Sequence, residues 1–161
     1  MIISDKYLRE TRKKKVTDEM IKKDLALSYI LYEMSEEIKQ NKNSPFNKLI
    51  FKGGTLLSKA HLDYHRLSED LDFTFSENPA LNKISKTKRQ KNIKQYLKKE
   101  FLPRFEIIVQ KYFFDFDSNE MNKETQKYCP IKSPIHLAKF YVYLDKTDQT
   151  LIKIEINFLD E

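Results

Sequence analysis

Two aspartates in the segment Asp70-Leu71-Asp72-Phe73 are the first sign of chemistry in this sequence. Side chains alternate across a β-strand, so a strand here places Asp70 and Asp72 on one face and Leu71 and Phe73 on the other. Neighbouring like charges repel, and aspartate is depleted from strands. We therefore expect a compensating positive charge, and a hard divalent cation with oxygen ligands fits the two carboxylates. An exposed edge strand that carries two ordinary acids is the alternative.

A third carboxylate lies far along the chain, in Lys153-Ile154-Glu155-Ile156. Isoleucines alternate here with polar residues, which predicts a strand with one apolar and one polar face. If this strand lies beside the strand of Asp70 and Asp72, Glu155 joins the same metal centre. Taken alone, Glu155 reads as a surface glutamate.

Gly53 and Gly54 are the only glycines of the chain, and they follow the apolar run Leu49-Ile50-Phe51 directly. Glycine is needed where the backbone takes a positive φ or where another group approaches it closely. Good helix formers follow from Thr55, so the turn leads into a helix N-terminus whose N–H groups can receive an anion. A diglycine alone is usually only a turn, and the spacing matches neither a P-loop nor a dinucleotide fingerprint.

The rest of the pattern predicts the elements that position these residues. An amphipathic helix is expected from the Thr17 N-cap to about Lys39, with Met20, Leu27, Leu31, Met34 and Ile38 on its apolar face. The remaining expected elements are a buried strand at 49–51, a helix after Gly54, a strand at 71–75, a basic helix from about 81 to 101 that ends near Pro103, a strand within 105–116, a loop at 117–134 and a hairpin of strands at 136–144 and 150–159.

These elements predict an α+β protein with a mixed β-sheet and helices packed on one face. At 161 residues the chain fits a single domain, with an N-terminal helical part at 1–45 and a sheet core at 46–161. The single cysteine, Cys129, together with the lack of a signal peptide or membrane span, leads us to expect a cytoplasmic protein with no membrane partner.

The net charge of +6 allows an anionic partner. The segment Lys83 to Lys99 carries eight Lys or Arg residues and no acid. A solvated helix face and a nucleic-acid patch explain this segment about equally well.

Together the motifs resemble a known family. The segments Phe51–Lys59 and Arg66–Phe73, followed by Lys153-Ile154-Glu155-Ile156, resemble the AbiEii/AbiGii toxin branch of the polymerase-β-like nucleotidyltransferases. That branch carries Lys-Gly-Gly-Thr-x-Leu-x-Lys, Arg-x-Ser-x-Asp-hydrophobic-Asp-Phe and a later Lys-x-Glu-hydrophobic strand. The resemblance runs from about residue 51 to residue 158 and implies a nucleotidyltransferase fold.

The resemblance also implies roles for individual residues. Asp70 and Asp72 would ligate Mg²⁺ or Mn²⁺, and Glu155 would ligate the metal that activates the attacking hydroxyl. Gly53 and Gly54 would line the triphosphate of a nucleoside triphosphate (NTP). The remaining matches to the nucleotide-binding pattern are Thr55, whose hydroxyl would contact phosphate or metal, Lys59, and Arg66 and Ser68, which would hold the loop that leads into the strand.

The implied activity is transfer of a nucleoside monophosphate from an NTP to a hydroxyl, with RNA as the expected acceptor, in a toxin–antitoxin or phage-defence setting. Family members continue into a helical C-terminal region with a further lysine and an Arg-Asp-x-x-Asp segment, for which this sequence has no candidate. We therefore expect either a separate chain that supplies this region or a truncated and inactive domain. The resemblance also implies a cognate antitoxin as a partner. The alternative function is a non-catalytic nucleotide- or RNA-binding module that retains the fold.

Overall fold

The computed structural model describes residues 17–53, 69–112, 114–119, 127–144 and 151–159. Its helices are α2 (Asp18–Gln40), the 3₁₀-helix η1 (Pro45–Lys48), α4 (Asn78–Leu81), α5 (Lys86–Gln95), the π-helical η3 (Tyr96–Phe101) and α6 (Leu102–Gln110). Its strands are β1 (Leu49–Lys52), β2 (Asp70–Phe75), β3 (Leu137–Tyr143) and β4 (Leu151–Asn157).

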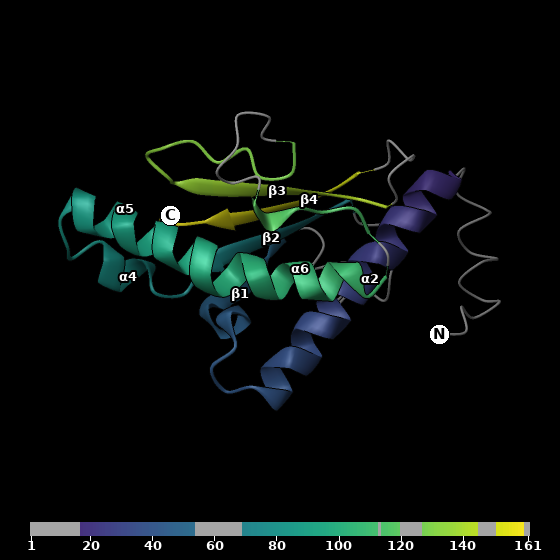
Figure 1. Cartoon of the computed structure of the whole chain (residues 1–161), viewed down its shortest axis with the longest axis horizontal. Helices are drawn as coiled ribbons and strands as arrows, with labels where there is room; N and C mark the ends of the chain where they lie inside the picture. The colour runs from purple at the N-terminus through teal and green to yellow at the C-terminus, as the bar shows by residue number, and fades with distance from the viewer. Residues whose placement is uncertain (1–16, 54–68, 113, 120–126, 145–150, 160–161) are drawn as a thin grey trace.

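The four strands form one mixed sheet in the order β1-β2-β4-β3. β1 pairs antiparallel with β2, β2 pairs parallel with β4, and β3 pairs antiparallel with β4. The described helices pack on one face of this sheet, where α5, η3 and α6 run end to end and α2 crosses near α6 (Figure 1). The predicted α+β class, with a mixed sheet and helices on one face, is confirmed.

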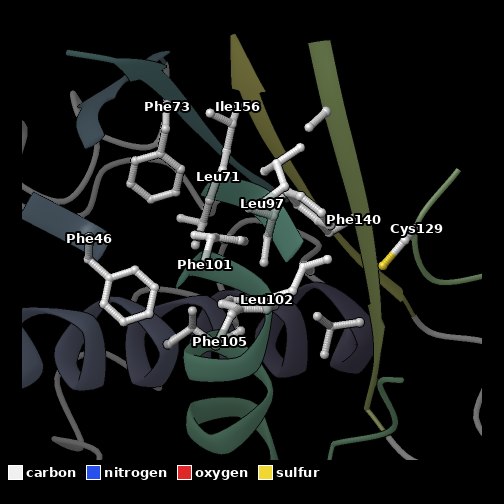
Figure 2. Packing of buried hydrophobic residues seen from close by; sticks show 14 of the residues in the cluster. Phe46, Leu71, Phe73, Leu97, Phe101, Leu102, Phe105, Cys129, Phe140 and Ile156 are labelled. Carbon is white, nitrogen blue, oxygen red and sulfur yellow. The ribbon is translucent and has the colours of Figure 1, made fainter. Parts of the chain in front are cut away.

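The core lies between the helices and the apolar face of the sheet. In β2 and β4 every second residue is buried, so that Leu71 and Phe73 lie beside Ile154 and Ile156. Aromatic rings connect the layers: Phe101 of η3 lies 5.7 Å from Phe46, 5.3 Å from Phe105 and 5.2 Å from Phe140 between ring centroids (Figure 2). The alternation therefore leaves the other face of the sheet to polar side chains.

The N-terminal helix is confirmed, and so is its cap, because the Thr17 side chain accepts a hydrogen bond from the Met20 N–H. Leu27 and Met34 are buried as expected, but Ile38 is 38% exposed and lies outside the core. The strand after it, β1, is not fully buried. β1 stands at the edge of the sheet and only one of its faces is covered, which leaves Ile50 55% exposed.

The prediction that the basic helix ends near Pro103 was wrong. The helical backbone runs on through α6 to Gln110, and Pro103 lies in the first turn of α6. The π-helical turns of η3 widen the hydrogen-bond ladder immediately before this point. Proline is tolerated in a first turn because its missing N–H has no intrahelical partner there.

No helix in the described ranges is long and apolar enough to cross a membrane.

The predicted strand within 105–116 was also wrong. Residues up to Gln110 are helical, with Phe105, Ile108 and Val109 buried at helical spacing. Among the described residues of this range, only Asp115 pairs with a strand, as a single bridge to Tyr143. A short apolar run does not distinguish a buried helix from a buried strand. The expected C-terminal pair of strands is confirmed by β3 and β4.

Packing of Phe101 generates the first testable prediction. Its ring is fully buried and contacts rings from η1, α6 and β3, so Phe101→Ala removes contacts that join three elements. We expect a loss of about 3–5 kcal/mol in the free energy of unfolding, measured by urea denaturation. Ile107→Ala is the matched control, because Ile107 is 51% exposed on α6, and it should change that energy by less than about 0.5 kcal/mol.

Candidate functional site

The polar face of the sheet brings the three predicted carboxylates onto adjacent strands. In the parallel pairing of β2 with β4, Asp72 lies opposite Glu155 and Asp70 lies opposite Lys153. Alternation along both strands puts these four side chains on the face away from the helical core. The expectation that the strand of Glu155 neighbours the strand of Asp70 and Asp72 is thus met by the register.

Two lysines neutralise part of this acidic group. The Lys153 ammonium lies 3.4 Å from Asp70 Oδ2 and 3.4 Å from Glu155 Oε1. Lys139, which is the partner of Glu155 on β3, approaches the same Glu155 oxygen at 3.1 Å. Two of the three carboxylates therefore carry a lysine partner.

Asp72 differs from its two neighbours. No ion pair to Asp72 occurs within the described residues, and burial together with the negative charges of Asp70 and Glu155 raises its pKa. Burial works in the same direction at Glu155, but the hydrogen bond from Lys139 and the charge of Lys153 outweigh it and lower the pKa of Glu155. The negative charges of Asp70 and Glu155 at Asp72 therefore favour an added cation there.

Gly53 closes the site from the side of β1. Its φ is +83°, and a Cβ built on it would lie 2.6 Å from Asp72 Oδ2. Only glycine takes this backbone conformation readily and leaves the space that the Asp72 carboxylate occupies. Both physical reasons predicted for the diglycine, a positive φ and a close approach, hold at Gly53.

This geometry agrees with a comparison against known protein families. A family model described as "Nucleotidyl transferase AbiEii toxin, Type IV TA system" matches residues 40–161. The chain belongs to the AbiEii family. Searches of curated proteins and of solved structures found no match.

The AbiEii chain offers a donor set that suits a hard divalent cation, because all three candidate ligands are carboxylates on one face of the sheet. As they stand, however, no three acidic, histidine or cysteine side chains of the described residues lie close enough together to hold a metal ion. Lys153 binds Asp70 and Glu155, so a cation held by all three carboxylates requires that this lysine release them.

Part of the predicted site lies outside the described residues: Gly54, Thr55, Lys59, Arg66 and Ser68. Lys139 and Lys153 were not predicted as site residues, although both occupy polar positions of alternating strands. The alternation was the available signal. Only the pairing register shows that these lysines face the carboxylates.

The raised pKa of Asp72 generates the second prediction. The ordinary value is 3.8, and the folded chain holds the proton more tightly, so ionised Asp72 destabilises the fold at pH 7. This penalty falls as the pH drops through the raised pKa and is gone below 3.8. Asp72→Asn should therefore increase the free energy of unfolding in EDTA at pH 7, by up to about 1 kcal/mol, and the gain should vanish at low pH.

Urea denaturation of both proteins at pH 7 and pH 3.5 measures this effect. Glu69→Gln is the control, because it removes the same charge from an exposed residue just before β2. An equal gain from Glu69→Gln would mean that overall charge, and not the field at Asp72, is responsible.

Proposed function

We propose that this chain is a divalent-metal-dependent nucleotidyltransferase that transfers a nucleoside monophosphate from an NTP to a hydroxyl on RNA. One observation carries the proposal: the parallel register sets Asp72 opposite Glu155, two residues from Asp70, on the polar face of the sheet. The family match supports the same reaction class. In this reaction the acceptor oxygen bonds to the α-phosphorus, the bond to the β-phosphate breaks, pyrophosphate leaves, and the hydroxyl proton passes to a carboxylate or to water.

In this proposal Asp70, Asp72 and Glu155 hold Mg²⁺ or Mn²⁺. The cation supplies electrostatic stabilisation of the charge that builds up on the reacting phosphate. Gly53 presents its backbone beside Asp72 without a side chain, which lets the Asp72 carboxylate lie close to the turn that is proposed to receive the triphosphate. Gly54, Thr55 and Lys59 remain the proposed triphosphate contacts, and Arg66 and Ser68 remain the proposed supports of the loop before β2.

The acceptor proposal rests on the basic segment. Lys88, Lys91 and Lys94 of α5 are exposed, whereas the Arg89 guanidinium donates a hydrogen bond to the Phe158 carbonyl and is half-buried. Arg89 therefore supports the end of β4, and the exposed lysines are the residues free to meet a phosphate backbone. By its family description, the chain acts in a toxin–antitoxin system, and we propose a cognate antitoxin as its protein partner.

The third prediction tests the reaction directly. The chain, incubated with Mg²⁺, RNA and each of the four common NTPs in turn, should release pyrophosphate and add a nucleotide to the RNA. Asp72→Asn and Glu155→Gln should each lower the rate by at least about a hundredfold, because each removes a proposed carboxylate ligand of the cation that stabilises the charge on the reacting phosphate. Coupled pyrophosphate detection and gel analysis of labelled RNA provide the two measurements.

The variants also distinguish the alternative function. NTP binding that depends on Asp72, without pyrophosphate release from any NTP, would identify a non-catalytic nucleotide-binding module. Unchanged NTP binding and turnover in both variants would remove the site assignment itself.

The fourth prediction concerns RNA binding by α5. Changing Lys88, Lys91 and Lys94 to Glu should weaken RNA binding across sequences and flatten its dependence on salt, because fewer counterions are released. NTP binding should be unaffected, since its proposed ligands lie on the polar face of the sheet and in the Gly53-Gly54 turn.

Filter binding at several salt concentrations measures the slope. A triple variant with Lys22, Lys42 and Lys132 changed to Glu is the control, because it alters net charge equally at exposed residues outside α5. If the salt dependence of RNA affinity is the same for the two triple variants, α5 is a solvated helix face and the RNA binds elsewhere.

A further inference from the structure

Lys153 lies between two of the proposed metal ligands. Its ammonium is 3.4 Å from both Asp70 and Glu155, and its side chain is 34% exposed. The Glu155 side chain is 19% exposed, so the pair is partly shielded from water. Ion pairs in such surroundings are screened less than pairs on an open surface. Lys153 is therefore a resident counter-ion for this side of the acidic group.

The lysine and a divalent cation require the same oxygens. A cation held by Asp70, Asp72 and Glu155 would use carboxylate oxygens that Lys153 now binds. Among the described residues Lys153 forms ion pairs with the two flanking acids, whereas Asp72, which lies beside Gly53, has no ion pair and is affected by Lys153 only through its charge. The three carboxylates thus share a face and yet, among the described residues, form no ready group of three ligands.

We propose that Lys153 competes with the divalent cation for Asp70 and Glu155 and thereby makes metal binding depend on the triphosphate. The inference rests on the proposed function. Metal alone must displace the ammonium and leave it without an anionic partner. A triphosphate bound on the same face offers the displaced ammonium a phosphate oxygen. Metal and triphosphate therefore assist each other's binding, and by linkage the assistance is equal in both directions.

Lys139 provides an internal comparison. It pairs with Glu155 alone, from β3, whereas Lys153 bridges two ligands from within β4. Removal of either lysine deletes one positive charge close to Glu155. Only removal of Lys153 takes a lysine away from both flanking carboxylates, so the two variants separate a bridging role from a general charge effect.

The fifth prediction uses Lys153→Met, with Mn²⁺ as the probe. Mn²⁺ titrations followed by electron paramagnetic resonance measure the metal affinity with and without a non-hydrolysable NTP analogue. Without the analogue, Lys153→Met should bind Mn²⁺ roughly tenfold more tightly than the wild type, because two ion pairs no longer compete. The analogue should then tighten Mn²⁺ binding less in Lys153→Met than in the wild type.

Three further variants complete the experiment. Lys153→Arg keeps the charge and should retain the weak metal affinity of the wild type, while Lys139→Met should give a clearly smaller gain than Lys153→Met. Lys153→Gln replaces Lys153→Met if thermal denaturation in EDTA shows that the methionine variant is unfolded.

The outcomes separate this inference from the proposed function. Mn²⁺ binding that is lost in Asp72→Asn but is no tighter in Lys153→Met than in the wild type would overturn the inference and leave the metal site standing. Equal gains in Mn²⁺ affinity from Lys153→Met and Lys139→Met would mean that the loss of any nearby positive charge causes the effect. This result would also overturn the inference. Mn²⁺ binding that is indifferent to Asp72→Asn, or absent from every variant, would overturn both the inference and the proposed site.

Discussion

The parallel pairing of β2 with β4 determines both the core and the candidate site. On one face this register stacks Leu71 and Phe73 against Ile154 and Ile156, which are all buried under the helices. On the other face the same register sets Asp72 opposite Glu155. A slip by one residue would turn every side chain to the wrong face, and the loss of apolar burial makes such a slip costly. The apolar core therefore holds the acidic residues in place.

The carboxylates of Asp70, Asp72 and Glu155 repel one another on the polar face of the sheet, and lysines compensate this repulsion only in part. Lys153 and Lys139 compensate Asp70 and Glu155, while Asp72 stays in a negative field and has a raised pKa. A hydrophobic replacement of these acids would remove the repulsion, so the fold alone gives no reason to keep three of them together. Gly53 supports the same conclusion, because its backbone has a positive φ and no side chain occupies the space that the Asp72 carboxylate fills. Retention of strained or repelling groups is typical of functional sites.

The elements with a clear period were predictable from the sequence. β2 and β4 alternate strictly, and α2 has both a capping threonine and an apolar stripe, so their types and approximate bounds followed from pattern alone. The segment around Pro103 was not predictable in this way. The π-helical stretch η3 precedes the proline, which therefore lies in the first turn of α6, and no local sequence pattern predicts such a stretch. The sequence also predicts a strand within 105–116, which is wrong because a short apolar run fits either period.

The residues of the candidate site also divide into those that the sequence predicts and those that it does not. Asp70, Asp72 and Gly53 are recognisable because their residue types are unusual at their positions, and Glu155 is recognisable from the combination of motifs. Lys139 and Lys153 are not, because a lysine on the polar face of a strand is ordinary until the register shows what it faces. Ion pairs between strands join residues that are far apart in the sequence. They depend on the strand register, which cannot be read from a single sequence.

The helical layer also reaches the site through the backbone of β4. The Asn78 side-chain amide, almost fully buried, donates hydrogen bonds to the carbonyls of Asn157 and Leu159, and Arg89 donates to the carbonyl of Phe158 between them. Three successive carbonyls at the end of β4 are thus held by α4 and α5. Glu155 lies two residues before this anchored segment, so its position follows from contacts on the helical side. Through Arg89, α5, which exposes Lys88 and Lys91 on its surface, is thus connected to the segment that directly follows β4 and its carboxylate Glu155.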